Sequence, residues 1–187
     1  MAENKKYFPI KTETACLKKW TWSSIYLSTG TTNSCHRCKE LPIDLDHFDD
    51  FHNLPKKLND RTLMLEGKWP VGGCEYCENI EKAGGVSDRL YHLTVPNLNP
   101  VELEQNVNAV TVTPGIVEVY LNNTCNLACT YCVPEFSSRI QQEIKRFGDF
   151  TQGDVVIVDD KKYIDQRLAF EKFCNWLEKN LKNIKRL

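Results

Sequence analysis

The stretch IVEVYLNNTCNLACTYC, residues 116–132, decides the fold that the sequence predicts. Its first six residues form a nearly continuous apolar run with β-branched and aromatic side chains, which is typical of a strand buried on both faces, as in parallel sheets. Three cysteines follow at once with C-x3-C-x2-C spacing. Loops at the carboxyl ends of parallel strands carry the chemistry of α/β proteins. We therefore expect Cys125, Cys129 and Cys132 to form a functional loop.

Three thiols this close together indicate metal binding. Cys thiolates are the usual ligands of iron–sulfur clusters, and a four-iron cluster normally takes four of them. A set of three would leave one iron open to a substrate or cofactor. A zinc site is the alternative, but structural zinc sites are closed by four ligands. No nearby His supplies a fourth ligand here.

The loop resembles the signature of the radical S-adenosylmethionine superfamily, C-x3-C-x-aromatic-C, with Cys125, Cys129, Tyr131 and Cys132 at the matching positions. The resemblance implies a 4Fe–4S cluster on the three cysteines and S-adenosylmethionine chelated to its open iron. It implies an enzyme that cleaves this cofactor reductively to a 5′-deoxyadenosyl radical, which abstracts hydrogen from a substrate. It also implies that Tyr131 lies near the adenine and that a flavodoxin- or ferredoxin-like protein donates the electron. No catalytic side chain is assigned.

Five further cysteines lie in the first half of the chain. The C-x2-C pairs Cys35/Cys38 and Cys74/Cys77 predict, on spacing alone, a zinc-ribbon-like site that leaves Cys16 unused. The spacing C-x13-G-x4-C, from Cys16 to Cys35, instead resembles the opening of SPASM and twitch auxiliary-cluster domains. That resemblance implies a second iron–sulfur cluster on Cys16, Cys35, Cys74 and Cys77, with Cys38 in reserve. Four protein ligands would favour electron relay, whereas three would leave an iron for substrate.

The likeness to twitch-type proteins covers about residues 15–145 and departs from them at Lys19, where relatives tend to have Pro. The expected fold is α/β with an α+β N-terminal part. Residues 1–93 would form a small Cys-rich twitch-like domain with a β-hairpin, and residues 94–115 a linker. Residues 116–187 would form the first β/α units of an incomplete (β/α)6 radical S-adenosylmethionine barrel.

Local patterns predict the elements of this fold. Residues 22–28 followed by Thr29 and Gly30 predict a hairpin, and two helices should end near Gly67 and near residues 84–85. A helix is expected over residues 137–147, with Ser137 or Ser138 as its N-cap, and residues 155–160 form a second strand or an edge hairpin. An amphipathic helix should follow from Tyr163, with Cys174 on its apolar stripe as a core thiol.

The sequence also predicts incompleteness. Nothing after Cys132 matches the Gly-Gly-Glu-like motif that the family places on its second barrel strand. The resemblance therefore implies a truncated frame or one half of a split gene, with a complementing C-terminal chain as partner. With one confident core strand, the stripe of the last helix should remain exposed. The alternative function is a zinc-binding interaction module without catalysis.

Composition restricts the remaining classes. Lys plus Arg is 24 and Asp plus Glu is 25, so the net charge of −1 steers the chain neither to nucleic acid nor to a membrane. No run approaches the roughly 20 apolar residues of a membrane span. Nine cysteines, seven of them in tight groups, favour metal in a reducing compartment, so the predicted location is cytoplasmic. The substrate, a peptide or a small molecule, is not identified, and the four histidines are interpreted as surface or capping residues.

Overall fold

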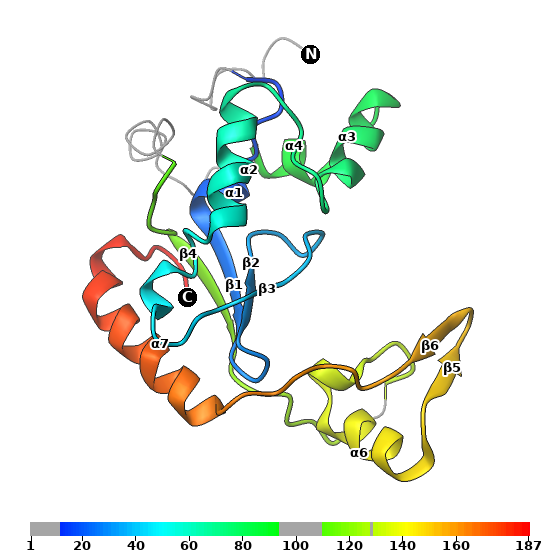
Figure 1. Ribbon diagram of the computed structural model, residues 1–187. Helices are drawn as coiled ribbons and strands as arrows, with labels where there is room; N and C mark the ends of the chain where they lie inside the picture. Colours follow the sequence, from blue (N-terminus) through cyan, green and yellow to red (C-terminus); the bar gives the residue numbers. More distant parts are fainter. Residues whose placement is uncertain (1–11, 94–109, 128) are drawn as a thin grey trace.

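The computed structural model describes residues 12–93, 110–127 and 129–187 (Figure 1). Its architecture is mixed α/β, with a small mixed sheet, surrounding helices and a separate hairpin. The strands are β1 (Trp22–Tyr26), β2 (Thr31–Asn33), β3 (Leu41–Pro42), β4 (Ile116–Tyr120), β5 (Phe150–Gln152) and β6 (Val155–Ile157). The helices are α1 (Leu17–Thr21), α2 (Pro55–Leu65), α3 (Glu75–Lys82), α4 (Asp88–Leu93), α6 (Ser138–Phe147) and α7 (Gln166–Asn180), with short 3-10 turns η2 (Phe48–Asp50), η3 (Pro134–Phe136) and η4 (Leu181–Asn183).

The predicted N-terminal hairpin is confirmed. β1 and β2 are antiparallel, with Tyr26 opposite Thr31. The turn between them needs Gly30, because its φ of +63° is a backbone conformation that residues with a Cβ rarely adopt. A Cβ at this position would also lie 2.5 Å from Cδ1 of Ile164. Gly30 therefore allows both the turn and the close passage of the segment that leads into α7.

The predicted strand after the linker is present as β4, but its expected burial on both faces is wrong. β4 pairs in parallel with β1 in a sheet of order β3-β2-β1-β4. Only Val117 of β4 is fully buried, and Glu118 is exposed. Since side chains alternate along a strand, Val117 and Val119 face one side, whereas Glu118 and Tyr120 face the other. The sheet therefore has an apolar face and a polar, aromatic face.

Helix α7 covers the apolar face (Figure 1). Ala169, Phe173 and Trp176 are buried in one cluster with Ile25 of β1 and Val117 of β4. The expectation that this stripe stays exposed for want of strands is wrong for Phe173 and Trp176, because β1 pairs with β4 and supplies the missing surface, whereas Phe170 stays 47% exposed. Cys174 is half-buried against the same cluster, as expected for a core thiol.

Segments on both sides of the predicted linker share this sheet and core. β4 and α7 come from the predicted C-terminal domain, whereas β1, β2 and β3 come from the predicted N-terminal one. Most of the linker, residues 94–109, lies outside the described residues. Arg186 forms a parallel bridge to Ile116 beside β4. The path from β4 through α7 to Arg186 is thus the beginning of a β–α–β crossover.

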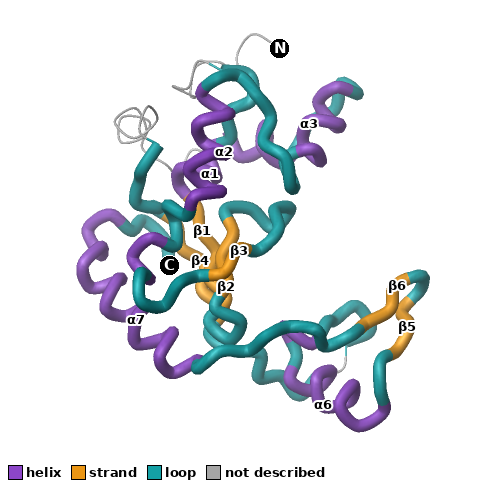
Figure 2. The backbone as a smooth tube through the Cα atoms, in the orientation of Figure 1, coloured by secondary structure: helices purple, strands orange, loops and turns teal. Residues whose placement is uncertain are grey.

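Helix α6 and the β5–β6 hairpin form a smaller cluster away from this sheet (Figure 2). The hydroxyl of Ser137 accepts a hydrogen bond from the amide of Ile140, which confirms the predicted cap. Ile140, Ile144 and Ile157 pack together as an apolar core. Residues 155–157 pair with 150–152, so the structure shows the hairpin among the two predicted arrangements.

Four short helices stand at the other end of the sheet (Figure 1). α2 ends at Leu65 and α3 at Lys82, close to the predicted glycine stops. A second buried cluster lies among them and contains Leu17, Trp20, Met64 and Cys74. No helix in the described ranges combines the length and apolar character that crossing a membrane requires.

Candidate metal centres

Five cysteines gather among the N-terminal helices. Cys16, Cys35, Cys38, Cys74 and Cys77 all line one cavity of about 20 Å³. A cavity of that size holds about one water-sized guest. Sequence reasoning grouped four of these thiols and kept Cys38 in reserve, whereas in the structure all five line the same cavity.

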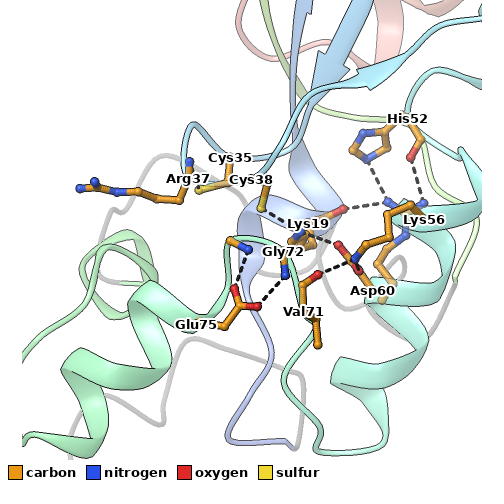
Figure 3. Close-up of polar contacts among 12 residues, drawn as sticks. Lys19, Cys35, Arg37, Cys38, His52, Lys56, Asp60, Val71, Gly72 and Glu75 are labelled. Carbon is orange, nitrogen blue, oxygen red and sulfur yellow. Dashed lines mark hydrogen bonds and ion pairs between the residues drawn. The ribbon is translucent and has the colours of Figure 1, made fainter. Parts of the chain in front are cut away.

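A close backbone approach joins the two C-x2-C pairs. Gly73 has φ +124°, and a Cβ on it would lie 2.4 Å from the carbonyl oxygen of Arg37 and 2.7 Å from Cα of Cys38. The Glu75 carboxylate accepts hydrogen bonds from the amides of Gly72 (2.7 Å) and Gly73 (2.6 Å) (Figure 3). This capped turn at the start of α3 lies directly against the first cysteine pair.

Arg37 stabilises the contact between the Cys35–Cys38 loop and α3 from outside the cavity. Its guanidinium lies 3.8 Å from the ring centroid of Tyr76 on α3, a cation–π contact. Its Nε donates to Asp88 at 3.3 Å. Arg37, between Cys35 and Cys38, thus connects this loop to both α3 and α4.

A buried lysine contacts the central thiol. Nζ of Lys19 lies 3.3 Å from Sγ of Cys38 and 2.7 Å from Oδ2 of Asp60 (Figure 3). Lys56 also donates to Asp60. Hydrogen bonds from the Cys35 and Cys74 thiols and the charge of Lys19 lower the pKa of Cys38. Cys38 is therefore the thiol that this site favours most strongly as a thiolate.

The remaining thiols of this group behave differently. Burial raises the pKa of the Cys16 thiol. Donating a hydrogen bond to Cys38 raises the pKa values of Cys35 and Cys74. These pKa shifts favour a thiolate at Cys38 beside neutral thiols at Cys16, Cys35 and Cys74. A thiophilic cation would deprotonate more of them, because a coordinating thiol loses its proton.

The walls of the cavity carry positive charge. Arg89 is buried, pairs with Glu81 and donates to the carbonyl of Ala15 at 2.8 Å. Its guanidinium lies 5.2 Å from the ring centroid of Trp69. Arg89 and Lys19 both line the cavity. They would offset the negative charge of thiolates if these held a metal ion or cluster.

More cations lie behind Lys19, beneath the sheet. Arg61 is fully buried and donates to the carbonyls of Lys19 (2.8 Å) and His52 (3.0 Å). Lys57 donates to the hydroxyls of Ser23 (3.0 Å) and Thr32 (2.9 Å). Burial, then the nearby charges of Arg61 and Lys19, lower the pKa of Lys57. The layer behind the thiols therefore contains the Arg61 guanidinium and several hydrogen-bond donors.

His52 is not the surface residue that the sequence suggested. It is buried, with Nε2 3.0 Å from the carbonyl of Trp20 and Nδ1 2.7 Å from the hydroxyl of Ser23. A carbonyl only accepts, so Nε2 carries the proton and Nδ1 accepts from Ser23. Burial and the charges of Lys57 and Arg61 lower its pKa. His36 and His47 are exposed, and the side chain of His92 lies outside the described residues.

The three-cysteine loop follows β4 and is tied to the start of α6. The hydroxyl of Ser138 accepts from the amide of Cys125 (3.0 Å) and donates to its carbonyl (3.2 Å). Ser137 donates to the carbonyl of Leu127 at 3.3 Å. The amide of Ser138 donates to the carbonyl of Asn123 at 2.6 Å. Two consecutive serines thus fix the first half of the loop.

The second half of the loop is more open. Cys125, Cys129 and Cys132 are each half-buried, and Cys132 packs against the α6 cluster. Tyr131 is 84% exposed and Leu127 60% exposed. Ala128 lies outside the described residues. The thiols and the tyrosine of the motif are thus accessible to a ligand.

The two cysteine groups lie at opposite ends of the sheet. β2 runs antiparallel to β1, so Cys35, just after β2, is near the start of β1. β4 runs parallel to β1, with Tyr120 opposite Tyr26, so Cys125 follows the other end. β1 has five residues, and a strand rises about 3.3 Å per residue. The strand therefore separates the groups by roughly 15 Å.

Within the described parts of the chain, no set of three or more His, Cys, Asp or Glu side chains is already arranged to hold a metal ion. The donor chemistry nonetheless fits a thiophilic metal, since the nine cysteines are free thiols. Cys174 belongs to neither group. The cavity, with five thiols and two cations, and the three-thiol loop are the two candidate centres.

Sequence reasoning missed the charged residues around the first centre. Lys19 was noted only as a departure from the family pattern, yet it contacts Cys38. Asp60 and Arg89 lie far from the cysteines in sequence and carry no local signal. Neither a family model, nor a curated protein, nor a solved structure matches the chain.

Proposed function

We propose that this chain is a radical S-adenosylmethionine protein with an N-terminal, twitch-like auxiliary centre. The observation that carries the proposal is the C-x3-C-x-Tyr-C loop directly after β4, at the carboxyl end of a parallel strand pair. The β4–α7–Arg186 crossover supports it, since α/β barrels are built from such units.

In this proposal Cys125, Cys129 and Cys132 hold a 4Fe–4S cluster. Bound there, the cluster supplies the electron that cleaves S-adenosylmethionine to a 5′-deoxyadenosyl radical. Ser137 and Ser138 position the loop backbone, and exposed Tyr131 offers a ring for the adenine to pack on.

The N-terminal group would hold the auxiliary centre. Lys19 and Arg89 offset the negative charge of its thiolates, and the cavity is lined by protein side chains. With four or more thiols available, every metal position can be closed by the chain itself. That supports a role in electron relay over direct substrate ligation.

Metal analysis of anaerobically reconstituted protein tests the proposal. We expect an oxygen-sensitive 4Fe–4S centre whose electron paramagnetic resonance spectrum changes when S-adenosylmethionine is added. Replacing Cys125, Cys129 and Cys132 together with Ala should remove about four irons per chain. The matched control is Cys174→Ala, in the half-buried core position, which should keep all iron. Equal iron content in both variants would overturn the assignment.

A zinc-binding module is the second candidate, and the small N-terminal cavity favours it. A space of about 20 Å³ suits one ion better than a cluster. Cys38, the hydrogen-bonded centre of the group, belongs to the zinc-ribbon set. Colourless protein with one zinc per chain, lost in Cys38→Ala and kept in Cys16→Ala, would establish this alternative. Brown protein that depends on Cys16 would exclude it.

A further inference from the structure

A second, much larger cavity lies on the polar face of the sheet, which α7 does not cover. Its volume is about 820 Å³, within the range of small-molecule sites. It extends from Cys38, which also lines the small thiol cavity, to Phe136 after the three-cysteine loop. Residues of β1, β2, β3 and β4 and of the segment before α7 line it, and one side is open to solvent.

One wall of this cavity is aromatic. Tyr26 and Tyr120, directly opposite each other on β1 and β4, stack with ring centroids 4.5 Å apart. Phe136 tilts against both rings, at 6.0 Å and 5.6 Å, and is 43% exposed. Burial raises the pKa of Tyr26 to about 12, so its hydroxyl stays protonated. Three rings joined in this way form a platform for a planar ligand ring.

An unsatisfied amide lies deep in the same cavity. Asn33 lines it and is only 4% exposed. Its Nδ2 donates to the hydroxyl of Tyr26 at 3.5 Å. Its Oδ1 has no hydrogen-bond partner among the described residues. A buried acceptor without a partner costs about 1–3 kcal/mol, and a ligand N–H or O–H would satisfy it.

Lysines stand around the cavity. Lys161 lies between the carboxylates of Glu40 (3.8 Å) and Glu135 (3.5 Å) and partly neutralises both. Lys39 and Lys162 also line the cavity, are exposed, and form no ion pair within the described part of the chain. They remain available to an anion.

We propose that this cavity binds a mononucleotide-like ligand, in which a planar ring bearing an N–H is joined to a phosphate. The ring packs on Phe136 and Tyr120, as bases stack on aromatic side chains. A donor on the ring edge pairs with Oδ1 of Asn33, as amides pair with base edges. Lys39 and Lys162 contact the phosphate.

Other ligand classes leave part of the cavity unused. A cationic ligand would leave Lys39 and Lys162 facing like charge, and a purely apolar one would leave Asn33 unpaired. The proposal stands on the cavity alone and requires no metal. Its failure is therefore distinguishable from failure of the radical S-adenosylmethionine assignment.

Calorimetric titration of the full chain with uridine and guanosine 5′-monophosphates tests it. We expect one saturable site, with uridine and phenyl phosphate each binding at least about tenfold more weakly than uridine 5′-monophosphate. The first lacks the phosphate and the second the N–H-bearing ring. No saturation by either nucleotide at about 1 mM overturns the proposal. Equal binding of uridine or of phenyl phosphate overturns it as well.

Variants separate the contacts. Lys39→Gln with Lys162→Gln should weaken uridine 5′-monophosphate about tenfold and leave uridine unchanged. Lys145→Gln with Lys182→Gln, exposed and outside the cavity lining, is the matched control. Asn33→Leu, of similar shape, should weaken nucleotide and uridine alike while phenyl phosphate binding persists. An unfolded variant would lose all three, so loss confined to the N–H-bearing ligands marks the Asn33 contact. Unchanged affinity in both cavity variants contradicts the proposal.

Discussion

The two cysteine groups differ in how the fold holds them. The N-terminal group is enclosed by α1, α3 and α4, with Cys74 and Cys77 buried and charged residues packed behind them. The C-terminal loop is held by two serines and leaves Tyr131 almost fully exposed. The first group is part of a folded core, whereas the second lies on a partly exposed loop. Changes at the first should affect stability, and changes at the second should affect ligands.

The largest expected effect is at Gly73. Gly73→Ala places a methyl 2.4 Å from a backbone oxygen at φ +124°, so the cysteine pairs must separate. We expect a loss of about 3 kcal/mol or more of unfolding free energy in urea. The control is Gly67→Ala, also at positive φ but with nothing within 4 Å, which should cost about 1 kcal/mol. Similar losses in both variants would show that the close approach is not what joins the pairs.

How far the sequence predicted this contrast depends on the range of the signal. Ser137 as a cap, Gly30 as a turn and the ends of α2 and α3 were predictable because caps and turns are local. The pairing of β4 with β1 was not, since about 90 residues separate them and no local pattern encodes a partner. Because this pairing was not predicted, the apolar stripe of α7 was wrongly expected to stay exposed. Glu118, inside an otherwise apolar run, was the available sign that β4 has a polar face.

The next effect concerns the buried ion pair. Lys19→Met leaves Asp60 with the partly exposed Lys56 as its remaining ion-pair partner in the described chain and removes the donor to Cys38. Breaking a buried pair by removing one partner costs about 3 kcal/mol, and the second cation should reduce this to about 2. The control is Lys82→Met, which breaks the exposed pair with Glu78 and should cost less than about 0.5 kcal/mol. Equal unfolding midpoints for the two variants would show that the Lys19–Asp60 ion pair does not stabilise the fold.

The candidate sites divide in the same way. Cysteine spacing identified all eight thiols of the two centres because ligand motifs are short and contiguous. The residues that give those thiols their electrostatic environment, such as Asp60 and Arg89, come from helices that only the tertiary fold brings near. Asn33 and the aromatic platform could not be predicted from the sequence either, since Tyr26 and Tyr120 come together only through strand pairing.

A smaller effect should appear in the pH dependence of stability. The pKa of His52 is lowered by burial and by Lys57 and Arg61, so the folded state keeps it neutral while the unfolded state protonates near pH 6.5. Its contribution is therefore present above that pH and is lost as pH falls, by roughly 1 kcal/mol per pH unit. His52→Gln should flatten the difference in unfolding free energy between pH 7 and pH 5.5. Parallel profiles for parent and variant would contradict the assignment.

The smallest effect on global stability should come from the C-terminal loop. Ser138→Ala removes the hydroxyl that bonds to both the amide and the carbonyl of Cys125. These bonds are partly solvated and together contribute about 1 kcal/mol. The loss should be confined to the loop, because the N-terminal core contains neither partner. We expect faster hydrogen exchange over residues 121–127 with the unfolding midpoint nearly unchanged. Thr62→Ala, which removes an exposed helical hydroxyl bonded to Leu58, is the control and should leave exchange in the loop as it is. A cooperative loss of stability in Ser138→Ala, comparable to that of Gly73→Ala, would mean that the loop belongs to the folded core and that the contrast between the two centres is false.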